Sequence, residues 1–109
     1  MSIAWKDYQE KNKDRFLNEM LELLRIPSVS AKSENKNDMR KCAELVRQRF
    51  LDSGADKAEV MNTDGHPVVY AEKIVDPTKP TVLVYGHYDV IDADRTKWLT
   101  NPFEMIGNK

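Results

Sequence analysis

The sequence predicts an α/β sandwich whose sheet contains strands of both directions. Three observations indicate it: apolar residues at helical spacing over residues 16–24, two short strand-like segments at residues 58–61 and 67–74, and an almost uninterrupted apolar run at residues 81–85. Apolar residues at three- and four-residue steps mark one face of a helix. Helices that precede strands, together with a strand that is apolar on both faces, are typical of a sheet covered by helices.

The first helix should end near Arg25 or Ile26. Pro27 pushes the residue before it out of the helical region of backbone conformation, so residues 28–31 are expected to be extended. The helix before that point is amphipathic. Its apolar stripe consists of Phe16, Leu17, Met20, Leu21, Leu23 and Leu24.

A second helix should begin at Asn37 or Asp38, either of which can cap its amino end. The polar stretch at residues 32–37 is expected to be a loop, and Gly54 is the natural end of the helix. One face of this helix carries Ala43, Val46 and Phe50.

The next two segments predict a β-hairpin. Residues 58–61 form its first strand, residues 62–65 its turn and residues 67–74 its second strand. The sequence Asp76-Pro77-Thr78-Lys79-Pro80 then breaks the chain. The apolar run at residues 81–85 follows as the predicted central strand.

A candidate metal site lies directly after this central strand. His87 and Asp89 are two positions apart, so they project to the same side if the extended conformation persists. A neutral imidazole is a common zinc ligand, and a carboxylate either binds the metal or fixes the tautomer of the histidine. Catalytic zinc normally has three protein ligands, and the sequence offers no other His, Cys or carboxylate cluster at ligand spacing. Part of the site is therefore expected to be missing, and His87 in isolation is more often a solvated residue.

Two other motifs favour structural explanations. His66 precedes a proline in the predicted turn, where an imidazole more often satisfies backbone groups than binds a metal. Ser33 and Lys36 have the Ser-x-x-Lys spacing of some serine acylases, but they lie in a polar loop without the required helix context.

Composition favours one ordered domain. The 109 residues include 17 basic and 18 acidic side chains, a balance that gives no overall field favouring nucleic acid or an anionic membrane. No apolar stretch approaches the roughly 20 residues that span a bilayer. A single cysteine, Cys42, excludes an intramolecular disulfide and agrees with a reducing compartment, so a cytoplasmic location is expected.

Four segments, in order along nearly the whole chain, carry a resemblance to a known family. They are Ile26-Pro27-Ser28-Val29-Ser30, Gly65-His66-Pro67-Val68-Val69-Tyr70-Ala71, Thr81-Val82-Leu83-Val84-Tyr85-Gly86-His87-Tyr88-Asp89-Val90, and Trp98 followed by Pro102-Phe103-Glu104. Together they resemble the amino-terminal part of a carnosinase-like dipeptidase. Such enzymes belong to the zinc-dependent dipeptidase, aminoacylase and deacetylase family, peptidase family M twenty.

The resemblance implies a fold and a division into domains. It implies a partial three-layer α/β/α domain of the zinc-exopeptidase (phosphorylase/hydrolase-like) type with a mixed sheet. Residues 1–109 would be the amino-terminal part of the catalytic, metal-binding domain, with the remainder of that domain and the lid domain absent.

The resemblance also implies site residues and cofactors. His87 corresponds to a ligand of one zinc ion, and Asp89 to the catalytic carboxylate that orients a metal-ligating imidazole. The whole enzyme would hold two zinc ions, with manganese or cobalt as other metals that such ligands suit. The family's other ligands and its glutamate base would lie past Lys109, so the 109 residues alone should bind no metal tightly and should be inactive.

The implied reaction is hydrolysis of dipeptides or related acyl-amino amide bonds. The expected partners are a small peptide or acyl-amino acid substrate and, for the whole protein, a second identical subunit; nucleic acid and membrane are not expected. A non-catalytic binding or assembly module that keeps the fold is the alternative, and the missing ligands are its support.

Overall fold

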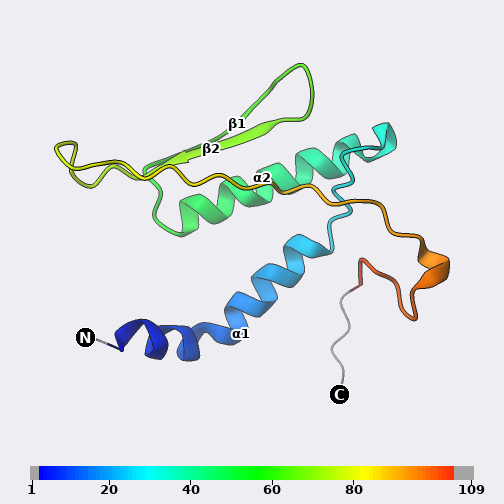
Figure 1. Ribbon diagram of the computed structural model, residues 1–109, viewed down its shortest axis with the longest axis horizontal. Coiled ribbons are helices and arrows are strands. Elements are labelled where there is room, and N and C mark those ends of the chain that lie inside the picture. Colours follow the sequence, from blue (N-terminus) through cyan, green and yellow to red (C-terminus); the bar gives the residue numbers. More distant parts are fainter. Residues whose placement is uncertain (1–2, 105–109) are drawn as a thin grey trace.

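A computed structural model describes residues 3–104 of the chain (Figure 1). The helix α1 (Ala4–Leu24) is followed by a short 3₁₀ turn η1 (Ser33–Asn35) and the helix α2 (Lys36–Asp52). The strands β1 (Lys57–Met61) and β2 (Val68–Glu72) come next, and a second 3₁₀ turn η2 (Arg95–Lys97) lies near the end of the described part. The predicted α/β class is confirmed.

Helix α1 ends where the proline predicts. The backbone N–H of Arg25 donates to the carbonyl of Leu21, and the N–H of Ile26 donates to Leu23, after which Pro27 stops the helix. None of the α1 residues is buried, and the apolar side chains of Phe16, Leu17 and Met20 remain exposed. The helix therefore presents an apolar stripe that residues 3–104 do not cover.

The predicted cap of α2 is wrong, although its position is close. Asn37 and Asp38 lie inside the helix, and Asn35 occupies the cap position without a side-chain capping bond. Turn η1 leads directly into the helix, and the N–H of Lys36 donates to the carbonyl of Ser33. Because that turn already supplies an acceptor for an N–H group at the helix start, a side-chain cap is not required there.

The carboxyl end of α2 has the predicted glycine. Gly54 has φ of +98°, in the left-handed region that favours glycine. Its N–H donates to the carbonyl of Leu51 at 3.0 Å, and the N–H of Ala55 donates to Phe50 at 3.0 Å. These two bonds form a Schellman motif, which satisfies carbonyls that the helix itself leaves free.

Strands β1 and β2 form the predicted antiparallel hairpin, which packs on α2 (Figure 1). Val60 pairs with Val69, and Ala58 pairs with Ala71. These four residues are half-buried, whereas their neighbours along each strand are mostly exposed. Helix α2 therefore covers one face of the hairpin and leaves the other open.

The core is small and lies where the segment after α1 crosses α2. Val29, Cys42 and Ala43 are almost fully buried, as is the side chain of Ser28. The buried apolar residues among those described are Ile26, Val29, Met39, Cys42 and Ala43.

The predicted central strand at residues 81–85 is not formed within residues 3–104. The segment runs back extended from the turn after β2 toward the loop after α1 (yellow to orange in Figure 1). Its residues 82–85 are 83% to 89% exposed. An apolar run indicates a strand that is buried on both faces. It does not itself provide the elements that bury those faces or the neighbouring strands that pair with its backbone N–H and C=O groups.

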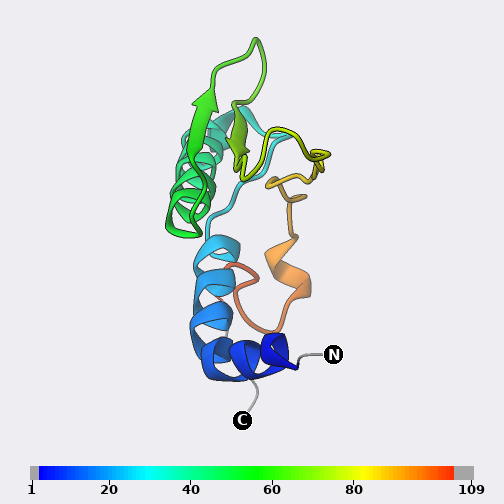
Figure 2. The same ribbon diagram turned by 90° about the vertical axis from the view of Figure 1, so that its left-hand side faces the viewer.

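Strand pairing in both directions is nevertheless present, in two separate places. The hairpin is antiparallel, and Val29 forms an isolated parallel bridge with Val90. Beyond that bridge the chain turns through η2, and in both Figure 1 and Figure 2 this last part (orange) lies below the β1–β2 hairpin.

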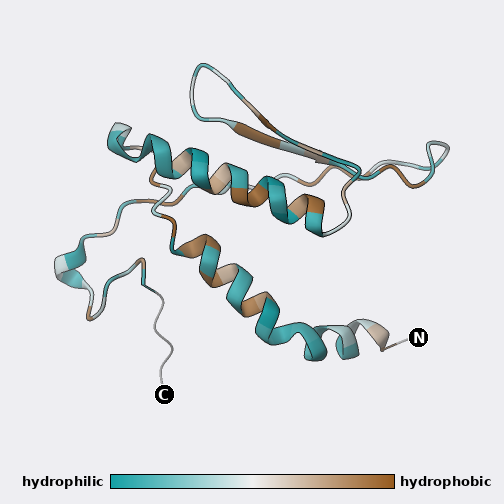
Figure 3. Cartoon of the chain, turned by 180° about the vertical axis from the view of Figure 1, so that it is seen from behind, coloured by the Kyte–Doolittle hydropathy of each residue, from teal (hydrophilic) through white to brown (hydrophobic). Residues whose placement is uncertain are grey.

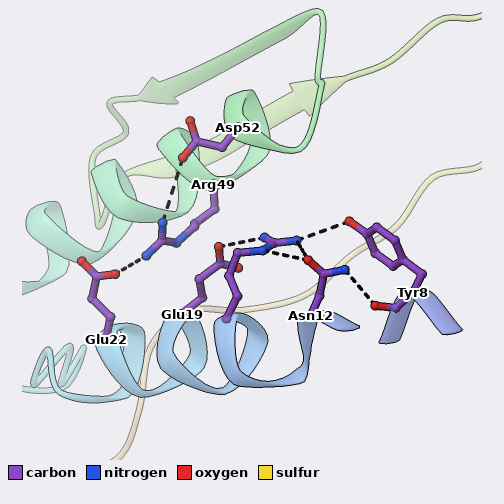
Figure 4. A network of polar contacts seen from close by, with 7 residues as sticks. Tyr8, Asn12, Glu19, Glu22, Arg49 and Asp52 are labelled. Carbon is purple, nitrogen blue, oxygen red and sulfur yellow. Dashed lines mark hydrogen bonds and ion pairs between the residues drawn. The ribbon is translucent and has the colours of Figure 1, made fainter. Parts of the chain in front are cut away.

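One ion pair among the described residues joins α1 to α2. Arg49 of α2 donates to the carboxylate of Glu22 on α1 and lies 4.0 Å from Asp52 on its own helix (Figure 4).

The apolar residues in the second half of α1 are visible in Figure 3. No helix among residues 3–104 is long and apolar enough to cross a membrane.

Candidate metal centre

His87 and Asp89 form a hydrogen-bonded pair. The distance from Nδ1 of His87 to Oδ1 of Asp89 is 2.9 Å, and Nδ1 also lies 3.2 Å from the backbone carbonyl of Asp89. An N–H on Nδ1 that donates to a carboxylate leaves Nε2 with its lone pair, which is the tautomer that binds a metal. The imidazole is 74% exposed, so Nε2 is accessible.

Ser30 makes a second bond to the same carboxylate. Its hydroxyl donates to Oδ2 of Asp89 at 2.5 Å, so each oxygen of Asp89 has a partner from another residue. The bond from Ser30 is the main cause that lowers the pKa of Asp89, and the bond from His87 lowers it further. Both bonds favour the ionised carboxylate, which is the form that accepts the imidazole proton.

The backbone beside the pair is fixed from the buried side. The N–H of Val90 donates to the carbonyl of Ser28 at 2.9 Å, and the hydroxyl of Ser28 donates to the carbonyl of Tyr88 at 3.0 Å. The thiol of Cys42 on α2 also lies 3.7 Å from that carbonyl. The site therefore sits on the core, with its metal-accessible nitrogen turned outward.

The second histidine has a structural contact, as the sequence predicts. Nε2 of His66 lies 2.7 Å from the backbone carbonyl of Ser30 and donates to it. The acceptor is not in the local turn, however, because Ser30 lies 36 residues earlier in the chain. His66 thus links the hairpin turn to the segment that carries Ser30.

The donor set fits one position of a metal site. Among residues 3–104, no three His, Cys, Asp or Glu side chains lie close enough together to hold a metal ion. His87 offers an accessible nitrogen with its other nitrogen held by a carboxylate, an arrangement that is usual for metal-ligating histidines. One such ligand is too few for tight binding.

Ser30 is the residue that sequence reasoning missed. It lies in a segment that was expected to be extended, 59 residues before Asp89. No spacing rule connects two residues so far apart, and serine is common in loops. Only its place in the motif Ile26-Pro27-Ser28-Val29-Ser30 distinguishes it in the sequence.

Comparisons with known proteins point to one group of enzymes. No family model matches the chain. The probable di- and tripeptidase DUG2 of Saccharomyces cerevisiae is 33% identical over 116 residues, covering 93% of this chain and 13% of that protein. The Cys-Gly metallodipeptidase dug1 of Schizosaccharomyces pombe is 33% identical over 111 residues, covering 92% of this chain and 23% of that protein.

A third relative matches over a shorter stretch, and one solved structure matches most of the fold. Human Beta-Ala-His dipeptidase is 58% identical over 40 residues, which is 36% of this chain and 8% of that protein. The structure of the dipeptidase Dug1p from Saccharomyces cerevisiae superposes with a TM-score of 0.80 at 28% identity, covering 89% of this chain and 23% of the other.

Three of these four matched proteins are named as dipeptidases and the fourth as a probable di- and tripeptidase. The Cys-Gly metallodipeptidases and Beta-Ala-His dipeptidase are homologues of this chain, matched over 92% and 36% of its length for the two relatives given above. The chain spans between 8% and 23% of the length of the three curated relatives described above.

Proposed function

We propose that these 109 residues form the amino-terminal part of the catalytic domain of a metal-dependent dipeptidase. In this proposal His87 is a metal ligand, and Asp89 is the catalytic carboxylate that orients it. The observation that carries the proposal is the bond between Nδ1 of His87 and Asp89, which leaves Nε2 accessible. The names of the relatives, which are dipeptidases, support the reaction class.

Each residue has a distinct role in this mechanism. Nε2 of His87 holds the metal, while Asp89 keeps the proton on Nδ1 and makes the ring a better donor. Activation of water for attack on an amide carbonyl is the chemistry that such a metal supplies when bound. The other ligands and the general base would come from outside residues 3–104, so we expect these residues alone to be inactive and to bind metal weakly.

The finer points of the proposal follow from the family resemblance. The metal is zinc, two ions in the whole protein, with manganese and cobalt as the alternatives to be compared. The substrate is a dipeptide, and the nearest competing substrate is an acyl-amino acid. The whole protein is a homodimer in the cytoplasm, and the reduced Cys42 agrees with that compartment.

The test compares metal binding and hydrolysis in the whole protein as its gene encodes it. Zinc binding is measured by calorimetry, and hydrolysis of Cys-Gly and β-Ala-His is measured with zinc, manganese or cobalt. Asp89→Asn should lower metal affinity or activity by about 10- to 100-fold, and His87→Ala by more. Asp64→Asn, which changes an exposed carboxylate in the hairpin turn, is the matched control and should have no effect.

Two results would contradict the proposal. One is a whole protein that binds no metal above the His87→Ala background, which would favour the non-catalytic module instead. The other is a metal-loaded protein that hydrolyses neither dipeptides nor acyl-amino acids.

A further inference from the structure

Ser30 occupies a position that the proposed function does not explain. Its hydroxyl reaches Oδ2 of Asp89 at 2.5 Å, a short distance that is typical of a hydroxyl donating to an ionised carboxylate. Asp89 uses its other oxygen to accept from His87. Ser30 and His87 therefore each donate to a different oxygen of the Asp89 carboxylate.

We propose that Ser30 is a positioning residue of the metal centre: its hydroxyl fixes the plane of the Asp89 carboxylate, and that carboxylate in turn fixes the ring of His87. This inference rests on the proposed function, because it assigns a role within the same site. Ser30 itself binds neither metal nor substrate.

The need for a second bond follows from the freedom of the aspartate side chain. The terminal torsion of an aspartate has broad minima, so one bond from His87 leaves its carboxylate free to rock. The imidazole is 74% exposed and receives little packing that would hold it. A donor at Oδ2 removes the rocking motion, because it fixes both oxygens relative to the backbone.

Ser30 is itself well anchored, which a positioning residue must be. The two residues before it, Ser28 and Val29, are 1% and 2% exposed. Val29 bridges to Val90, one residue beyond Asp89, and His66 donates to the carbonyl of Ser30 at 2.7 Å. The backbone of Ser30 is thus tied both to the core and to the hairpin turn.

Hydrogen bonds link four residues in series, and the first of these bonds ends on a backbone carbonyl. His66 donates to the Ser30 carbonyl, the Ser30 hydroxyl donates to Asp89, and His87 donates to Asp89 from the other side. Of the two histidines, His87 is the one bonded to Asp89, and its side chain is 74% exposed. In this proposal, residues that do not contact the metal fix the orientation of the His87 ring, as is common around metal sites.

The test uses Ser30→Ala and Ser30→Thr in the whole protein. Threonine keeps the hydroxyl, whereas alanine removes it. Zinc affinity is measured by calorimetry, and the visible absorption spectrum of the Co²⁺-loaded protein reports the geometry around the metal. Ser33→Ala, an exposed serine in η1, is the matched control.

We expect Ser30→Ala to lower zinc affinity by about 10-fold and to change the Co²⁺ spectrum, with thermal stability measured separately for each variant. Ser30→Thr should restore both properties, and Ser33→Ala should alter neither. A purely structural role for Ser30 would lower the melting temperature and leave the Co²⁺ spectrum unchanged, which would overturn the inference.

His87→Ala, measured alongside, separates the two proposals. If it abolishes binding while Ser30→Ala retains the affinity and spectrum of the unmodified protein, the positioning role is wrong and the proposed function stands. If His87→Ala itself leaves metal binding unchanged, the proposed function is wrong and the role of Ser30 is overturned with it.

Discussion

At the scale of single residues, Asp56 secures the open end of the hairpin. Its Oδ1 accepts from Nζ of Lys73 at 2.9 Å, and its Oδ2 accepts from the backbone N–H of Ile74 at 3.1 Å. Its own N–H donates to the carbonyl of Glu72. The lysine is the main cause that lowers the pKa of Asp56, followed by the backbone bond from Ile74.

The sign of this pKa change predicts how acid acts on the hairpin. A carboxylate whose pKa is lower in the folded state stabilises the fold above its ordinary value of 3.8, and that contribution is lost as pH falls through the lower value. We therefore expect the Ile74 amide to lose hydrogen-exchange protection as the pH falls below 3.8, after correction for intrinsic rates. The loss should be only about 2- to 5-fold, because the Asp56–Lys73 pair is exposed.

Asp56→Asn should already show reduced protection at pH 6 and should lose little more on acidification. Asp64→Asn should behave like the unmodified protein at each pH. A steep pH dependence that persists in Asp56→Asn would assign the effect to another carboxylate.

The site was only partly predictable from single residues. The spacing of His87 and Asp89 predicts that they share a side, and their 2.9 Å contact agrees with it because the chain stays extended there. The bond from Ser30 was not predictable, because it depends on how two distant segments come together. The metal-ligating role itself remains a prediction.

At the scale of elements, residues 82–85 form an exposed apolar segment that favours association with other chains. Its side chains are uncovered on both faces, and it pairs with no strand among residues 3–104. Free strands of this kind pair with one another. Each valine buried in such a contact contributes up to about 1.5–3 kcal/mol, which favours association and is offset in part by the entropy that two chains lose when they associate.

We expect the isolated 109-residue chain to self-associate, and the double variant Val82→Lys with Val84→Lys to associate at least about 10-fold more weakly. Sedimentation over a range of concentrations measures the difference. Val75→Lys with Ile91→Lys is the matched control, since it adds the same charge at two exposed apolar residues outside the segment. Equal effects of both pairs would show that added charge, and not this segment, governs association.

The elements also show which patterns the sequence can encode by itself. The ends of α1 and α2 were predictable because proline and glycine act through local backbone geometry. The hairpin was predictable because its two strands are neighbours in sequence. The strand at residues 81–85 was not, because pairing requires partners whose presence no local pattern determines.

At the scale of the whole molecule, the chain is flat and open. Its radius of gyration is 16.9 Å, whereas a compact domain of this length has about 13 Å. Its dimensions are 52 × 43 × 18 Å. So thin a molecule has room for only the few buried residues around Val29 and Cys42.

This shape predicts weak cooperativity when the 109 residues are studied alone. A core of that size contributes too little to offset the loss of chain entropy, so the unfolding transition should be broad. Circular dichroism at 222 nm, which follows α1 and α2, and near-ultraviolet circular dichroism, which follows the packing of aromatic side chains, should give different midpoints. Coincident, sharp transitions by both probes would contradict this prediction.

The parallel bridge between Val29 and Val90 has a consequence for the order of folding. The bond from Ser30 to Asp89 and the bond from Ser28 to the Tyr88 carbonyl span 59 and 60 residues, whereas α1, α2 and the hairpin are built from local contacts. The entropy of closing so long a loop must be lost before these distant contacts stabilise the fold. We therefore expect Ser30 to reach Asp89 after the helices and the hairpin have formed, and during synthesis the contact requires that Asp89 has left the ribosome.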